Sequence, residues 1–136
     1  MLFRSIQQDT LIYLYTAAAA QNANNADKAI DFLDKYLAGG GKDPNAIQRK
    51  ISLIYVEKKD YERALKDIRS ARKTFPQDSW LVEMELQCLL DMNRYDEATK
   101  TVEQMLQTKP NDVKLIMLKG NLLDATDKPE IGRAHV

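Results

Sequence analysis

The sequence predicts an all-α protein in which antiparallel helix hairpins stack as a repeat array. The segment 61–64 (YERA) recurs 34 residues later as 95–98 (YDEA), and Pro76 recurs at the same interval as Pro110. A fixed period of this length is typical of a stacked supersecondary unit. The chain has only four prolines and five glycines among 136 residues, so most of it can be helical.

Helix start signals and apolar periodicity divide the chain into about seven helices. Asp43 can cap a helix that begins at Pro44. Asp78 or Ser79 can cap another that begins near Trp80. Between such starts, apolar residues recur at helical spacing, and the short loops favour antiparallel neighbours. The expected helices are residues 8–22, 26–38, 44–57, 60–74, 78–91, 94–107 and 111–124.

Two weaker copies flank the central pair of repeats. Upstream, Ala29 and Leu33 repeat the pattern of a second helix. The glycines at 39–41 lengthen the connection that follows, and we interpret them as a flexible connector. Downstream, residues 113–125 repeat a first helix, with Gly120 where a small residue is expected. The array therefore amounts to about three and a half repeats.

The two ends of the chain do not resemble the rest of it. Residues 2–5 can be encoded by CTC TTC CGA TCT, and residues 131–136 by ATC GGA AGA GCA CAC GTC. These words match one sequencing adapter on opposite strands. We therefore expect residues 1–5 and 131–136 to be adapter-derived and the repeat array to occupy 6–130, truncated at both ends. Fold reasoning then applies to 6–130 alone.

Charge and hydropathy narrow the class of partner. Lys and Arg number 20, as do Asp and Glu, so no basic field favours nucleic acid. No apolar run reaches the roughly 20 residues of a membrane-spanning helix. The segment 11–20 is the most apolar, and it reads as a buried helix rather than a signal peptide. The sequence gives neither the oligomeric state nor the compartment, and cytoplasmic and periplasmic locations both stay open.

Side chains suited to catalysis or metal binding are scarce. The single histidine, His135, lies in the expected adapter segment, and the single cysteine, Cys88, lies in an apolar helix. A His-containing nucleophile pair or zinc site cannot then be built from 6–130. The run Gly39–Lys42 lacks the spacing and the following Ser or Thr of a phosphate-binding loop. We expect no catalytic residue, no metal site and no cofactor, and we interpret Cys88 as a buried structural residue.

These repeats resemble the tetratricopeptide repeat family. The resemblance rests on the period, on Ala64-x-x-x-Ile68 with Pro76, and on the corresponding residues of the next copy, and it is strongest over 45–112. It implies a right-handed solenoid of helix hairpins. Three positions depart from the family pattern. Ser52 and Leu86 stand where glycine is usual, and Glu85 stands where an apolar residue is usual.

The resemblance also implies a function, because the first helix of each hairpin lines a concave groove in this family. The chain is then expected to be a non-catalytic scaffold that binds a protein, as a peptide or a partner helix. Trp80 beside Met84, with Glu83 and Gln87, suits such a partner, although Trp80 could instead pack between hairpins. The expected groove residues are Leu14, Arg49, Lys50, Leu53, Trp80, Glu83, Met84, Gln87, Met117 and Asn121.

Two other functions stay open. The array could be one region of a larger enzyme or of an outer-membrane glycan-capture protein. Some family members hold a chaperone's C-terminal carboxylates with Lys, Asn and Arg at set groove positions. The residues at those positions here do not form that clamp, so the resemblance does not extend to it. They are Leu14, Ala18, Lys50, Trp80 and Met84.

Overall fold

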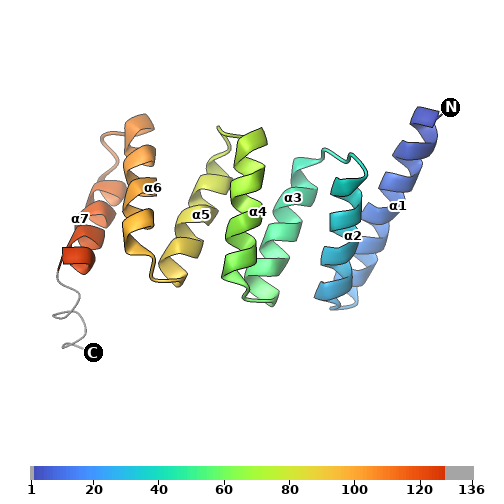
Figure 1. The fold of residues 1–136 in the computed structure, drawn as a ribbon, viewed down its shortest axis with the longest axis horizontal. Coiled ribbons are helices and arrows are strands. Elements are labelled where there is room, and N and C mark those ends of the chain that lie inside the picture. The colour runs from blue at the N-terminus through green and yellow to red at the C-terminus, as the bar shows by residue number, and fades with distance from the viewer. Residues whose placement is uncertain (1, 128–136) are drawn as a thin grey trace. The chain divides into compact units, whose positions relative to one another are not determined.

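The structure is a computed structural model that describes residues 2–127 and the side chains of residues 10–126. Helices and turns account for the described part of the chain, and no strand occurs in it, so the all-α prediction is confirmed (Figure 1). The segment 131–136, which we expected to be adapter-derived, lies outside the described residues. The elements are α1 (Leu2–Asn22), α2 (Ala26–Ala38), α3 (Pro44–Ser52), the π-helix η1 (Leu53–Glu57), α4 (Tyr61–Thr74), α5 (Ser79–Asp91), α6 (Tyr95–Thr108) and α7 (Val113–Asp127).

The predicted helices are all present, and their bounds differ mainly at the two ends of the array. The first begins at Leu2 rather than residue 8, and the last ends at Asp127 rather than residue 124. Contacts divide the chain into two units, with the boundary inside α4 after Asp67. Each unit is described by itself below.

Unit 1 is held together by small residues at the α1–α2 contact and by larger aliphatic residues around it. α1 and α2 run antiparallel, and α3 packs against α2 (Figure 1). Ala17 and Ala29 are fully buried, which lets these two helices approach closely. The rings of Tyr13 and Phe32 also meet across the pair, with centroids 6.1 Å apart. The larger buried residues of this unit are Ile30, Leu33, Ile51, Leu53, Ile54 and Leu65.

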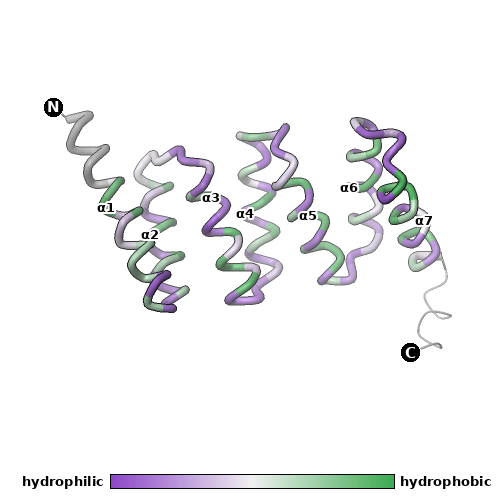
Figure 2. Tube along the Cα trace, turned by 180° about the vertical axis from the view of Figure 1, so that it is seen from behind, coloured by the Kyte–Doolittle hydropathy of each residue, from purple (hydrophilic) through white to green (hydrophobic). Residues whose placement is uncertain are grey.

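Unit 2 repeats this design with α5, α6 and α7. α6 contacts both α5 and α7, and each helix alternates apolar and polar residues along its length (Figure 2). Ala98, the repeat alanine, is fully buried. Burial of apolar surface at helical spacing is the main force that holds such hairpins together. The other fully buried residues of this unit include Ile68, Leu81, Cys88, Leu89 and Val102.

Two of the three hairpin turns share one design. Asn24 and Asn93 adopt positive φ values of 59° and 58° just after α1 and α5. The residue that follows each of them donates a backbone hydrogen bond to a carbonyl five residues back, from Asn25 to Ala20 and from Arg94 to Leu89. Asparagine tolerates this left-handed conformation better than most residues, so both turns are locally favourable.

The third turn, between η1 and α4, has the same length but is closed by a longer-range backbone bond. Here the left-handed position is Lys59, with φ 51°, and the N–H of Asp60 reaches the carbonyl of Ile54, six residues back. Together α3 and η1 span 44–57, the predicted helix, and its last part is the wider π-helix.

Two of the glycines at 39–41 have a local structural requirement, one for its backbone conformation and one for its contact with Tyr36. Gly40 has φ +93°, which disfavours other residues. A Cβ on Gly41 would overlap the Tyr36 ring, so any other residue there would force the ring to shift. The Tyr36 hydroxyl also accepts a hydrogen bond of 3.0 Å from the Asp43 N–H, which fixes the residue that caps α3.

Candidate partner-binding surface

The expected contact residues of α5 lie on the side of this helix that faces away from its buried residues. The Asp78 carboxylate begins α5 by accepting hydrogen bonds from the backbone N–H groups of Trp80 and Leu81, at 3.0 and 3.3 Å. Leu81 and Leu89 then turn inward and are buried. Trp80 is left half-buried, one helical turn from the half-buried Met84.

Polar side chains flank this apolar pair. Glu83 and Gln87 are both exposed and lie one turn apart on α5. Gln87 is partly restrained, because its amide lies 3.5 Å from the Asp91 carboxylate. α5 therefore presents an aromatic ring and a thioether beside groups that can accept and donate hydrogen bonds.

α7 supplies the other two expected residues of unit 2. Its first turn is capped by Asp112, which accepts hydrogen bonds from the N–H groups of Lys114 and Leu115. Met117 is 63% exposed, and Asn121 is exposed one turn further on. The exposed apolar residues Val113 and Ile116 extend this surface, and the sequence analysis did not include them.

In unit 1 the expected contact residues are largely engaged within the unit. Lys50 forms ion pairs with Asp34 and Asp67, and only 13% of its side chain is exposed. The Arg49 guanidinium donates to the Gln21 side chain at 3.1 Å. Leu53 is buried and offers a partner little surface. The remaining expected residue, Leu14, is half-buried.

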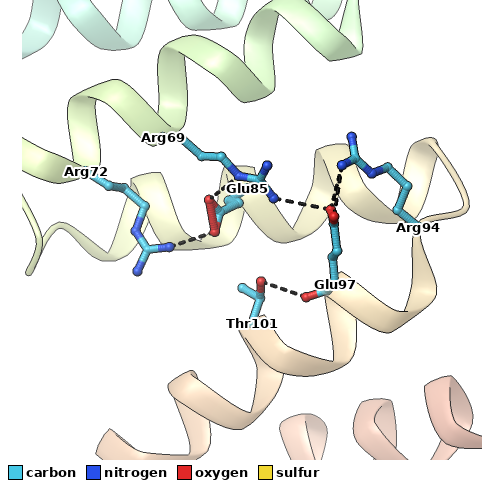
Figure 3. A network of polar contacts seen from close by, with 6 residues as sticks. All are labelled: Arg69, Arg72, Glu85, Arg94, Glu97 and Thr101. Carbon is cyan, nitrogen blue, oxygen red and sulfur yellow. Dashed lines mark hydrogen bonds and ion pairs between the residues drawn. The ribbon is translucent and has the colours of Figure 1, made fainter.

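A network of charged residues in unit 2 was not predicted (Figure 3). Glu85, on α5, is buried and lies between two arginines of α4: Arg69 Nε donates to one carboxylate oxygen at 3.3 Å, and Arg72 Nη1 to the other at 2.7 Å. Arg69 also reaches Glu97 of α6 at 3.3 Å. Arg94 pairs with the same Glu97 at 2.9 Å. The network thus links three helices.

The sequence contained a signal for this network. Glu85 departs from the apolar pattern, and Arg69 and Arg72 lie three residues apart, on one face of α4. A buried carboxylate requires cations and donors, so these arginines were the candidates to search for. Figure 3 also shows Thr101, whose hydroxyl donates to the Glu97 carbonyl at 3.1 Å and so ties the network to the α6 backbone.

Two ionisable groups have environments that shift their titration. The hydrogen bond from Arg94, with help from Arg69, lowers the pKa of Glu97 below its usual value. Burial raises the pKa of the Cys88 thiol to about 11, and the charges of Asp91 and Glu85 add to the effect. Cys88 is completely buried, as expected, and a thiol with this pKa is a poor nucleophile near neutral pH.

The described residues contain no cluster of three His, Cys, Asp or Glu side chains that could hold a metal ion. Among the helices described, none is both long enough and apolar enough to cross a membrane.

The helices and their turns place the chain among the helical-hairpin repeat proteins. The family model "Tetratricopeptide repeat" matches residues 55–122. The chain therefore belongs to the tetratricopeptide repeat family, whose members are protein-interaction repeat domains. Comparison with curated proteins finds no significant match.

Solved structures support the fold independently. The first tetratricopeptide repeat domain of Spaghetti (RPAP3), bound to the HSP90 peptide SRMEEVD, has a TM-score of 0.62 and 18% identity, covering 88% of this chain and 97% of that one. A chain of the Sec complex from S. cerevisiae has a TM-score of 0.74 and 15% identity, covering 93% and 73%. The Arabidopsis OM64 domain has a TM-score of 0.62 and 14% identity, covering 86% and 96%. At such identities the similarity establishes the fold alone.

Proposed function

We propose that this chain holds a partner protein, as a peptide or a helix, against the first helices of its hairpins, with α5 and α7 as the main contacts. The half-buried pair Trp80 and Met84, one turn apart on the side of α5 away from its buried residues, carries the proposal. Aromatic and methionine side chains bury large areas on binding and adapt to different partners. Glu83 and Gln87 supply hydrogen bonds at the edge, and Met117 and Asn121 provide an apolar and a polar contact on α7.

The contribution of unit 1 is expected to be smaller. Lys50 would have to leave two carboxylates before it could bind a partner, and Leu53 is buried. Leu14 and Arg49 are the better candidates there, because both keep part of their surface exposed. Arg49 would give up only one hydrogen bond, to Gln21.

We also infer that binding, rather than catalysis, is the role of this segment. The one cysteine is buried with a raised pKa. The charged residues that lie closest together form internal ion pairs across helices, which is typical of structural networks. Neither a cofactor nor nucleic acid is part of the proposal, because the balanced charge favours no polyanion.

A peptide display experiment tests the proposed surface directly. Peptides selected on the wild-type chain would be measured by calorimetry against the double variant Trp80→Ala, Met84→Ala. We expect at least tenfold weaker binding, which corresponds to about 1.4 kcal/mol. Circular dichroism and thermal unfolding would show that the variant is folded. Peptides that bind wild type and double variant equally would overturn the surface assignment.

The chain offers a matched control. Tyr15 on α1 is 71% exposed, so Tyr15→Ala also removes an exposed aromatic ring. Selected peptides should lose less affinity for this variant than for the α5 double variant, because unit 1 is expected to contribute less. Equal losses for both variants would mean that the peptides recognise exposed apolar surface without specificity.

A further inference from the structure

One face of α7 carries an apolar stripe that is exposed along the length of the helix. Its side chains recur at helical spacing, with exposed fractions of 66, 50, 63 and 42% for Val113, Ile116, Met117 and Leu123. Gly120 lies in the middle of the stripe, and apart from its own helix no described atom lies within 4 Å of the place where it would carry a Cβ. A contiguous apolar surface of this kind marks an interaction site.

Comparison with α5 shows that a second helix of the repeat would not cover the whole stripe. α5 and α7 occupy equivalent places 34 residues apart, and α6 packs against α5. The α5 residue equivalent to Leu123 is buried in that hairpin. Ser79 and Glu83 stay exposed there, and their equivalents on α7 are Val113 and Met117. The stripe is therefore wider than the surface that such a hairpin buries.

Two charges at opposite ends of α7 indicate what covers the stripe. Lys114 lies in the first turn and Asp124 in the last, and both are exposed and form no ion pair with any described residue. Both oppose the helix macrodipole, which favours anions at the N-terminus and cations at the C-terminus. The equivalent residues of α5, Trp80 and Leu90, are uncharged, so the repeat does not require these charges either. An antiparallel copy of α7 would place each lysine beside the aspartate of the other chain.

The apolar residues fit the same arrangement. With a two-fold axis at Gly120, Ile116 lies opposite Leu123 of the second copy, and the two glycines face each other, so the backbones can approach closely. We propose that α7 pairs with α7 of a second copy of this chain, antiparallel and centred on Gly120. Such a contact uses the same surface on both chains, so it closes at two copies.

Sedimentation equilibrium of the full chain tests the dimer. One pair of helix faces is a small interface, so over a range of about 5 to 500 µM we expect a reversible monomer–dimer equilibrium with a Kd of about 1–100 µM. A chain that stays monomeric over this range, or that forms assemblies larger than two copies, would overturn the proposal.

Charge exchange tests the antiparallel pairing. Lys114→Glu and Asp124→Lys, each alone, place like charges opposite each other and should weaken the dimer at least about fivefold. The double variant restores opposite charges and should return the Kd to within about twofold of wild type. Both changes suit the macrodipole of α7, so the helix should stay folded, as circular dichroism would show. A double variant that dimerises no better than the single variants would contradict the pairing.

A matched pair of isoleucines tests the stripe itself. Ile116→Glu places a carboxylate at the contact and should weaken the dimer at least about tenfold. Ile12 on α1 is 57% exposed, against 50% for Ile116, so Ile12→Glu is the control and should leave the Kd unchanged. Equal losses for the two variants would reduce the dimer to association of any exposed apolar surface and overturn the site.

A second helix of the repeat type is the alternative occupant. Its probe is a labelled peptide with the sequence of α6, residues 94–109. Saturable binding of this peptide to a chain that remains monomeric would assign the stripe to such a helix and overturn the proposal.

The dimer and the proposed function fail separately. Met117 belongs both to the stripe and to the proposed partner surface, but the variants of the sedimentation test leave it and the α5 residues unchanged. Sedimentation is measured without peptide, and the display experiment depends on Trp80 and Met84. A monomeric chain therefore leaves the display experiment unaffected, and equal peptide binding by the α5 double variant leaves the dimer unaffected.

Discussion

Ile51 in unit 1 and Glu85 in unit 2 occupy the same position of successive repeats, 34 residues apart. Both are buried, with exposed fractions of 1% and 6%. Ile51 contributes apolar surface, whereas Glu85 requires Arg69 and Arg72. The repeat position thus determines how deeply a side chain is buried. The preceding helix determines which chemistry can be buried there.

The same contrast appears in the ion pairs of the two units. Asp34 and Arg69 each follow the repeat alanine of their helix by five residues, so they occupy equivalent places with opposite charges. Asp34 pairs with Lys50 of α3, and Arg69 pairs with Glu85 of α5. Each second helix therefore matches the first helix that follows it, and the hairpins are not interchangeable in sequence order.

The largest effect on stability is expected for Ile51→Glu, which places the residue of unit 2 at the equivalent position of unit 1. It buries a carboxylate that lacks the two arginine partners of Glu85. The adjacent Lys50 is not free to replace them, because it already pairs with Asp34 and Asp67. We expect a loss of about 3–5 kcal/mol in the free energy of unfolding, measured by urea denaturation. Ile51→Val is the control and should cost about 0.5–1.5 kcal/mol. A similar small loss for both variants would show that the position tolerates charge.

The next largest effect is expected for Glu85→Ala. It leaves Arg72 without its carboxylate, whereas Arg69 keeps Glu97 and, at 45% exposed, can also partly rehydrate. The free energy of unfolding should fall by about 3 kcal/mol, the lower limit for breaking a buried pair.

A triple variant separates the network from its position. The variant Glu85→Ile, Arg69→Leu, Arg72→Leu places an isoleucine where unit 1 has Ile51 and removes both arginine partners of Glu85. Its stability should equal or exceed that of wild type, because replacing the buried Glu85 together with both of its arginines by apolar residues avoids the desolvation cost of Glu85. A triple variant as unstable as Glu85→Ala would show that the network itself stabilises unit 2.

These two positions also show what sequence reasoning could reach. Period, caps and apolar spacing are local properties, so they located seven helices to within a few residues, apart from the start of α1. The role of Glu85 depends on two side chains of another helix, and only the three-dimensional arrangement brings them together. The close packing of Gly41 on the Tyr36 ring, five residues earlier, likewise depends on side-chain geometry that composition and spacing do not show.

The candidate surface was predictable to a lesser degree. The family pattern assigns residues to the first helices, but it does not reveal which of them are engaged within the chain. Lys50 and Arg49 have internal partners, whereas Met117 is largely exposed. Side-chain competition of this kind depends on distances that the sequence does not contain.

The turns provide a smaller test of the same comparison. Lys59 adopts the left-handed conformation that Asn24 and Asn93 adopt in the other two turns. Lys59→Asn should raise the free energy of unfolding by about 0.5–1 kcal/mol, because asparagine is less strained there. Asn93→Lys is the reciprocal variant and should lower stability by a similar amount in urea denaturation. No change in either variant would mean that η1 relaxes the turn independently of its residue.

The smallest expected effect concerns the pH dependence of unit 2. The pKa of Glu97 is lower in the folded chain than its ordinary value of 4.5, mainly through Arg94. The ionised form therefore stabilises the fold at higher pH. This contribution should be complete above pH 4.5 and lost as the pH falls through the lowered value. The measurement is the urea midpoint of the wild type at a series of pH values from neutral to acidic.

Glu97→Gln removes the titrating group while keeping a hydrogen-bond acceptor for Arg94 and Arg69. Its stability should change less on acidification than that of wild type, and high salt should reduce the difference between them, because Glu97 is 41% exposed and its ion pairs are screened. Parallel pH profiles for the two proteins would show that Glu97 does not contribute to the loss of stability in acid.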